Sequence, residues 1–249
     1  MISQKWSKLV RSLQQKKYRK AEQLFFVEGE KAVLELLASP WQVEAVFATD
    51  TFLQRYPQHV KAAALVQQCS AEELVKVGTF ASNDAALAVV KMPAPSDFVP
   101  PSHGFVLVLD QINDPGNLGT MIRIADWYGI KHIVCSLDTA DCYNPKVIAA
   151  AKGSFLRVQL HYQALQPLLA QATLPVYGAY LGGESVHQLQ LTQAGGFIVL
   201  GNEANGISAE LEQVINRKIT IPAFGDAESL NVGIAAAVIC DNLMRLSKA

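Results

Sequence analysis

From residue 105 onward, short apolar runs alternate with segments of helical period, and this alternation restricts the possible folds more than any other feature. The first run, FVLVLD, is apolar almost without interruption, as an interior strand of a parallel sheet requires. Further strands are predicted at residues 132–135, 156–160, 175–180, 197–201 and 218–221, and helices near 118–128, 144–151, 164–171, 208–215 and 230–246. The second half therefore predicts an α/β domain with a mostly parallel six-stranded sheet.

A smaller α/β domain is predicted upstream, because strands and helices also alternate there. The expected strands are residues 24–27, 43–48, 63–67 and 86–91, and the expected helices are 30–38, 51–55 and 71–77. A polar helical stretch over residues 3–20 precedes them, and its apolar stripe is suited to docking on this domain: Trp6, Leu9, Val10 and Leu13. Residues 93–103 hold four prolines and predict a linker, so the predicted domains are residues 1–92 and 104–249.

Composition narrows the class of protein. Half of the 249 residues are hydrophobic and 17% are charged, yet no apolar run approaches the about 20 residues that a membrane span needs. The first residues lack a secretory apolar segment, and the four cysteines show no metal-ligand spacing with the five histidines. We therefore expect a soluble cytoplasmic protein with reduced thiols, no metal and no membrane partner.

Charge is distributed unevenly along the chain. Seven of the 21 basic residues and none of the 22 acidic ones lie in the first twenty residues, which gives +7 for this segment and −8 for the rest. Such a segment can hold a polyanion through phosphate contacts, or it can be a solvated helix face. Charge alone leaves both possibilities open.

Three loops that follow predicted strands are rich in Gly, Asn and charged residues: 111–119, 200–208 and 221–231. Ligands of open α/β sheets bind beyond the carboxyl ends of the strands. Taken singly, each loop has an ordinary structural explanation, with helix caps at Asn117, Ser208 or Ser229 and an ion pair of Arg123 with Asp126. The loops lack the dinucleotide fingerprint and the P-loop spacing, which disfavours a nicotinamide-dependent oxidoreductase.

Taken together, these loops resemble the three motifs of the SpoU-type RNA ribose 2′-O-methyltransferases, which belong to the knotted SPOUT class. The resemblance rests on residues 113–119 with Arg123, on 201–203 with Gly206, and on 221–222 with 229–232. It continues through residues 141–146 and 152–154 and spans about residues 104–245. Residues 17–37 are similar to the ribosomal-protein-like substrate-binding domain that many members carry.

The resemblance implies a C-terminal trefoil knot, a homodimer through the C-terminal domain, S-adenosylmethionine as cofactor, and tRNA or rRNA as substrate. It implies cofactor binding, largely by backbone groups, at Gly178, Ala179, Gly201, Ile221 and Leu230. It assigns catalytic or orienting roles to Arg123, Asn117, Glu203, Ser229 and Asn231. Because a guanidinium stays protonated, we expect Arg123 to stabilise negative charge rather than accept a proton.

The expected function is therefore S-adenosylmethionine-dependent methylation of a ribose 2′-hydroxyl in tRNA or rRNA. The alternative is a non-catalytic RNA-binding protein that retains the knotted fold, and the presence of all five catalytic-type residues argues against it. In the basic segment, four residues are expected to contact RNA phosphates: Lys16, Lys17, Arg19 and Lys20.

Overall fold

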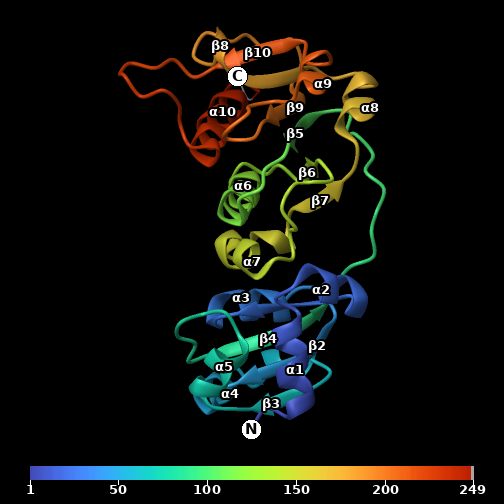
Figure 1. Ribbon diagram of the computed structural model, residues 1–249, viewed down its shortest axis with the longest axis vertical. Helices are drawn as coiled ribbons and strands as arrows, with labels where there is room; N and C mark the ends of the chain where they lie inside the picture. Colours follow the sequence, from blue (N-terminus) through green and yellow to red (C-terminus); the bar gives the residue numbers. More distant parts are fainter. Residues whose placement is uncertain (248–249) are drawn as a thin grey trace. The chain divides into compact units, whose positions relative to one another are not determined.

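The computed structural model describes residues 1–247, which form two compact units (Figure 1). The first unit comprises Met1–Ala94 together with Asp141–Leu156, and the second comprises Pro95–Ala140 and the chain from Arg157 onward. Along the chain, the segment Asp141–Leu156 lies between two strands of the second sheet. Its packing with the first unit is a feature that the sequence pattern does not reveal.

The first unit contains a four-stranded sheet in the order β1-β4-β2-β3, in which only the β2–β3 pair is parallel. The strands are β1 (Leu24–Glu28), β2 (Val43–Ala48), β3 (Val66–Gln68) and β4 (Ala86–Lys91). The helices are α1 (Gln4–Ser12), α2 (Lys16–Glu22), α3 (Glu30–Leu37), α4 (Asp50–Arg55), η1 (His59–Ala62), α5 (Ala71–Val77), α7 (Pro145–Ala151) and η2 (Ser154–Leu156).

The helical stretch predicted over residues 3–20 is two helices, because the chain is extended at Gln15 between α1 and α2. The Arg19 guanidinium donates hydrogen bonds to the carbonyl oxygens of Leu13 and Gln14, at 2.8 and 3.0 Å. In a continuous helix these oxygens would accept backbone N–H groups instead. The predicted docking stripe of α1 is confirmed, since Val10 and Leu13 are buried in the core with Leu74 and Val77 of α5.

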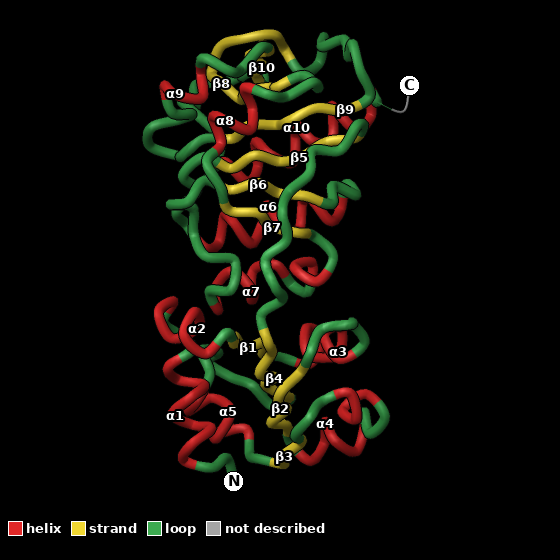
Figure 2. Tube along the Cα trace, turned by 90° about the vertical axis from the view of Figure 1, so that its right-hand side faces the viewer, coloured by secondary structure: helices red, strands yellow, loops and turns green. Residues whose placement is uncertain are grey.

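The second unit confirms the predicted parallel sheet. Its six strands run in the order β10-β8-β9-β5-β6-β7 (Figure 2). Every neighbouring pair is parallel. The strands are β5 (Gly104–Leu109), β6 (His132–Cys135), β7 (Gln159–Tyr162), β8 (Val176–Ser185), β9 (Gly195–Leu200) and β10 (Arg217–Thr220). The helices are α6 (Pro115–Trp127), α8 (Leu165–Ala170), α9 (Ala209–Glu212) and α10 (Val232–Leu246).

Helices cover both faces of this sheet, as its continuous apolar strands require. Leu165 and Leu169 of α8 and Leu211 of α9 pack with Val108 and Val199 in one buried cluster. Helices α6 and α10 pack against each other on the opposite side (Figure 1). Because all six strands are parallel, their carboxyl ends lie along one edge, and the loops that leave this edge carry the candidate site.

Within residues 1–247, no helix is both long and apolar enough to span a bilayer.

Candidate functional site

Three loops are joined by hydrogen bonds at the carboxyl edge of the second sheet. They follow β5, β9 and β10 and correspond to the three loops singled out in the sequence. Each loop leads into a helix, namely α6, α9 and α10. The site is therefore built from three strand ends and the beginnings of three helices.

Asn117 lies at the centre of these hydrogen bonds. The N-cap of α6 is Asp114 rather than Asn117, because the Asp114 carboxylate accepts the backbone N–H of Asn117 at 2.8 Å. The Asn117 side chain is thereby released from capping. Its amide group donates to the Glu203 carboxylate, and its oxygen accepts from the amide of Asn231 at 3.1 Å. One side chain thus connects all three loops.

The loop after β9 presents Glu203 from a tightly bonded turn. Asn202 donates to the carbonyl of Gln111 at 2.8 Å and accepts the backbone N–H of Ala204 at 2.9 Å. A Cβ on Gly201 would overlap the backbone of Gly206, so this turn admits no side chain at residue 201. Glu203 itself is exposed, and the turn holds it at the edge of the sheet.

Two residues to which the sequence assigned no role support the same edge. The buried carboxylate of Asp110, at the end of β5, accepts the backbone N–H of Ser208 at 2.7 Å. Asn202 fixes the turn from which Glu203 projects. The acidic residue that ends the otherwise apolar run FVLVLD was the available signal for Asp110, whereas nothing local distinguished Asn202 from a turn asparagine.

Asn231, and not Ser229, is the N-cap of α10. Its side-chain oxygen accepts the backbone N–H groups of Gly233 and Ile234 at 2.9 and 3.4 Å. Ser229 is exposed in the preceding loop, and Leu230 is 48% exposed. The side-chain oxygen of Asn231 therefore caps α10, and its amide nitrogen donates a hydrogen bond to Asn117.

Arg123 is exposed on α6, six residues after Asn117 and about 9 Å further along the helix axis. The alternative ion pair with Asp126 is wrong, because Asp126 pairs with Arg157 at 2.8 Å. Among residues 1–247, the Arg123 side chain makes no hydrogen bond or ion pair. Its guanidinium is thus available to an external anion.

The predicted cofactor positions come from three adjacent strands and the loop before α10. Gly178 and Ala179 lie on β8, between β9, which precedes Gly201, and β10, which precedes Ile221. Gly178 is buried, and a Cβ there would come within 2.7 Å of Ile215. The strand register sets Gly178 beside Val199 and Lys218, so these strand ends are neighbours.

The predicted RNA contacts in α2 do not form a uniform group. Lys16, Lys17 and Lys20 are exposed, but Arg19 is only 1% exposed. Its guanidinium forms an ion pair with Asp141 at 2.6 Å, in addition to the two carbonyl contacts described above. We therefore remove Arg19 from the phosphate-contact prediction, because burial and these contacts occupy its donors.

In the described part of the chain, no cluster of three or more His, Cys, Asp or Glu side chains is arranged to hold a metal ion.

The parallel sheet and the bonded loops at its carboxyl edge define an α/β protein with a candidate ligand site, and comparison with known proteins supplies the family. The chain belongs to the SpoU rRNA methylase family, whose model matches residues 104–241. A second model, the MRM3-like substrate binding domain, matches residues 7–88. The resemblance inferred from the motifs is thereby confirmed.

Among curated proteins, the chain is 31% identical over 237 residues to the 23S rRNA (guanosine(2553)-2′-O)-methyltransferase RlmP of Bacillus subtilis, covering 94% of this chain and 93% of the relative. It is 30% identical over 171 residues to the 23S rRNA (uridine(2479)-2′-O)-methyltransferase of Streptomyces viridochromogenes, covering 64% and 59%. The predicted enzyme class, an RNA 2′-O-ribose methyltransferase, agrees with these relatives.

Solved structures give the same result for the fold. A TrmH-family protein from Porphyromonas gingivalis superposes with a TM-score of 0.88 at 36% identity, covering 98% of this chain and 99% of that one. An rRNA methyltransferase from Sinorhizobium meliloti with bound AdoMet has a TM-score of 0.88 at 24% identity, covering 98% and 97%, and this likeness establishes the fold. The predicted two-part architecture, with an α/β catalytic domain and a substrate-binding domain, is confirmed.

Proposed function

We propose that this protein methylates a ribose 2′-hydroxyl of ribosomal RNA with S-adenosylmethionine as the methyl donor. The observation that carries the proposal is the hydrogen-bonded chain Glu203–Asn117–Asn231, which unites three loops at the carboxyl edge of a parallel sheet. Both curated relatives described above are named as 23S rRNA ribose methyltransferases, which supports rRNA over tRNA.

The residues at this edge fit the proposed cofactor. Gly178 and Gly201 expose no side chain, which favours binding by backbone groups. Ile221 is half-buried and Leu230 is 48% exposed, so both offer apolar surface to an organic ligand. With Ala179, these are the proposed cofactor-binding positions, and the bound cofactor would supply an electrophilic methyl group on a sulfonium.

Arg123 is the proposed catalytic residue. Methyl transfer depends on placing the ribose oxygen in line with the methyl group, and such placement contributes up to about 7–11 kcal/mol. Because the Arg123 guanidinium has no partner among the described residues, it can bind the developing oxyanion or the neighbouring phosphate. Its role is electrostatic, since an arginine side chain is a poor proton acceptor.

Four polar residues are proposed to orient the reactants around Arg123. Asn117, Glu203 and Asn231 form one hydrogen-bonded chain, so their side chains hold one another in place. Ser229 lies two residues before the cap of α10 and is exposed. Its hydroxyl is therefore free to contact the ribose or the cofactor.

The first unit is proposed to bind the RNA, in agreement with its match to a substrate binding domain. Lys16, Lys17 and Lys20 supply exposed positive charge on α2, suited to phosphates. The proposed division into an RNA-binding domain (residues 1–92), a linker (93–103) and a catalytic domain (104–249) follows the sequence expectation. The nature of the substrate makes the cytoplasm the expected compartment.

We also propose a trefoil knot at α10 and a homodimer through the C-terminal domain. Two large apolar side chains on the packed helices α6 and α10 support the dimer, since Trp127 is 84% exposed and Ile234 is 55% exposed. An interface between two copies would remove these side chains from water. Size-exclusion chromatography with light scattering gives the oligomeric state directly.

The activity is tested by transfer of a tritium-labelled methyl group from the cofactor to 23S rRNA, with bulk tRNA as the competing substrate. Label is expected in rRNA, at a position where alkali fails to cleave the RNA, because a 2′-O-methyl group removes the attacking hydroxyl. Cofactor binding without transfer to either RNA would contradict the proposal and favour a non-catalytic RNA-binding protein.

A further inference from the structure

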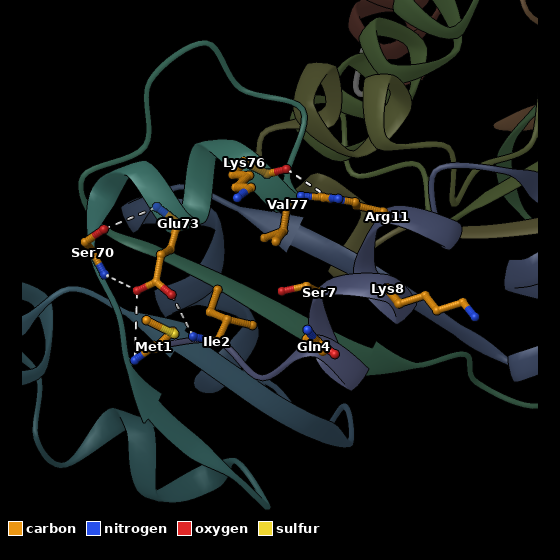
Figure 3. A pocket seen from close by; sticks show the side chains of 10 residues that line it. All are labelled: Met1, Ile2, Gln4, Ser7, Lys8, Arg11, Ser70, Glu73, Lys76 and Val77. Carbon is orange, nitrogen blue, oxygen red and sulfur yellow. Dashed lines mark hydrogen bonds and ion pairs between the residues drawn. The ribbon is translucent and has the colours of Figure 1, made fainter.

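A groove with a volume of about 730 Å³ lies in the first unit between helices α1 and α5 (Figure 3). One face of α1 forms one wall, with Ser7, Lys8 and Arg11. Helix α5 forms the other wall, with Glu73 and Lys76. The two helices belong to the same compact unit and pack on the same core, so the walls are held in a fixed relation.

The walls carry three cationic side chains and one carboxylate, which leaves a net side-chain charge of +2. Lys8 is exposed, and its ammonium group makes no hydrogen bond or ion pair with any residue of the described chain. Arg11 donates only its Nε–H, to the backbone carbonyl of Lys76 at 3.3 Å. The remaining N–H groups of Arg11 and the whole Lys8 ammonium are therefore available to a ligand.

The carboxylate of Glu73 is turned to the protein. It accepts the backbone N–H of Ile2 at 2.8 Å and that of Ser70 at 3.1 Å, the second of these as part of the capping box of α5 (Figure 3). These donors keep the carboxylate charged, and the amino group of Met1, 3.9 Å away, offsets part of that negative charge. The groove consequently presents positive charge to its open side.

The rest of the lining indicates which part of a nucleic acid would fit. Ile2 and Val77 are buried at the base of the groove, and none of its ten lining residues is aromatic. Base recognition in single-stranded RNA relies on stacking platforms, whereas lysine, arginine and serine side chains bind phosphate and sugar. The lining favours a sugar–phosphate backbone over an unstacked base.

We propose that the groove between α1 and α5 is a binding site for an RNA sugar–phosphate strand, with Lys8, Arg11 and Lys76 as phosphate contacts and Ser7 at the wall between them. This inference rests on the proposed function, because it assumes an RNA substrate. The groove is a second RNA contact, formed by α1 and α5, in addition to the lysines of α2. The groove contributes affinity and position along the RNA, and it leaves the choice of nucleotide to the catalytic domain.

The test measures binding of the full-length protein to a 23S rRNA fragment by fluorescence anisotropy. The salt concentration is varied from about 50 to about 200 mM, because affinity that depends on phosphate contacts falls steeply over this range. The groove variant is Lys8→Gln with Lys76→Gln. The matched control is Lys61→Gln with Lys91→Gln, which removes two exposed charges from the same unit outside the groove. Ser7→Glu adds a carboxylate inside the groove and keeps a good helix former.

The plot of log K against log salt has a negative slope, and the groove variant is expected to make it shallower by about 1.4–1.8. This value follows from two lost phosphate contacts, each of which contributes about 0.7–0.9 to the slope. Ser7→Glu is expected to weaken binding further, and the control to keep the wild-type slope. The proposal would be overturned if the groove variant and Ser7→Glu both matched the control. This result is also the one expected if the groove binds a protein instead of RNA. Cofactor affinity, measured in the same variants, is expected to be unchanged.

Failure of this inference is distinguishable from failure of the proposed function. If the groove inference alone is wrong, wild type, groove variant and control all methylate rRNA with the same KM. If the proposed function is wrong, wild-type protein transfers no methyl group even at saturating RNA, and the groove site falls with it.

Discussion

The Arg123 guanidinium is free within the described chain because its nearest acidic neighbour on the helix is bound to another arginine. The obvious partner, Asp126, is held by Arg157 through two hydrogen bonds to the Nε–H, at 3.1 and 2.9 Å. A guanidinium without a partner on a helix surface contributes little to stability, but it can bind an external anion and so stabilise developing negative charge. The sequence could not exclude the i,i+3 pair, because Arg157 lies 31 residues beyond Asp126.

Replacing Arg123 by alanine is expected to lower kcat by at least about 100-fold, the size of effect seen when one oxyanion-stabilising donor is removed. The dissociation constant for the cofactor should stay within a few-fold, because the proposed cofactor positions lie on β8, β9, β10 and the loop before α10. Steady-state kinetics and calorimetry measure the two quantities. Arg157→Ala is the control, and equal losses of activity and cofactor binding in Arg123→Ala would contradict the role.

Gly201 is a second residue whose identity is fixed by its surroundings. Because a Cβ would overlap the Gly206 backbone, Gly201→Ala is expected to destabilise the protein by about 1–3 kcal/mol and to weaken cofactor binding. Urea denaturation measures the first effect. Gly182→Ala is the matched control, since a Cβ at residue 182 meets nothing within 4 Å. Equal stability of the two variants would show that the turn relaxes at no cost.

At the scale of elements, the sheet was predictable, whereas the helix beginnings were predictable only in part: Ser208 is the N-cap of α9, as expected, but two other caps differ. Six apolar runs in alternation with helical patterns indicated a parallel sheet, and all six strands are present. The cap positions were predicted at Asn117 and Ser229, but they fall at Asp114 and Asn231, because each loop offers several capping residue types within a few positions. Strand β7 begins at Gln159 because η2 occupies residues 154–156.

The start of α10 provides a test that separates capping from site geometry. Asn231→Asp keeps the capping oxygen but lacks the N–H group that binds Asn117, so it is expected to lose methyl transfer with little change in stability. Asn231→Ala loses both interactions and should also lose about 1 kcal/mol of unfolding free energy. Thermal denaturation and activity measure the pair. Full activity in Asn231→Asp would show that the Asn117 contact is dispensable.

A histidine pair on β6 and β7 contacts the segment that precedes β5. His132 Nδ1 and His161 Nε2 lie 3.3 Å apart, and the ring of Phe98 lies 5.0 Å from that of His161. Burial lowers the pKa of both histidines, and for His132 the neighbouring His161 lowers it further. The backbone carbonyl of Ser96 opposes the shift at His161. Both rings are thus favoured in the neutral form.

Because the folded pKa values are depressed, the stability that these rings contribute is present above the unfolded pKa of about 6.5 and is lost as the pH falls below it. The melting temperature is therefore expected to drop between about pH 7 and pH 5, and to drop less when both residues are replaced by glutamine. His187→Gln is the control, as His187 is exposed. An identical pH profile for wild type and the double variant would contradict this assignment.

At the scale of the whole molecule, the contacts do not follow the order of the chain. The segment Asp141–Leu156 packs with the first unit, and Phe25 of β1 contacts Tyr143 and Phe155 of that segment at ring distances of 4.8 and 6.2 Å. The ion pair of Arg19 with Asp141 joins residues 122 positions apart. Charge patterning placed Arg19 among the RNA contacts because no local signal reveals a partner so distant.

The three short motifs singled out in the sequence lie together in the structure, while the roles of their residues stay predictions. The hydrogen bonds among Asn117, Glu203 and Asn231 connect residues 86 and 114 positions apart, which periodicity cannot foresee. The family resemblance supplied that connection, and the structure supplies the donors and acceptors. The cofactor positions and the knot remain predictions that ligand-bound and topological data would test.

We propose that this molecule places a 2′-O-methyl group on ribosomal RNA and that Arg123 is required for the transfer. The most direct measurement maps 2′-O-methyl groups across total RNA from cells that lack the protein, complemented with wild type or with Arg123→Ala. We expect one rRNA ribose to be methylated in the strain with wild-type protein and unmethylated in the deletion strain and in the strain with Arg123→Ala. An identical methylation map in all three strains, or a methyl group restored by Arg123→Ala, would contradict it.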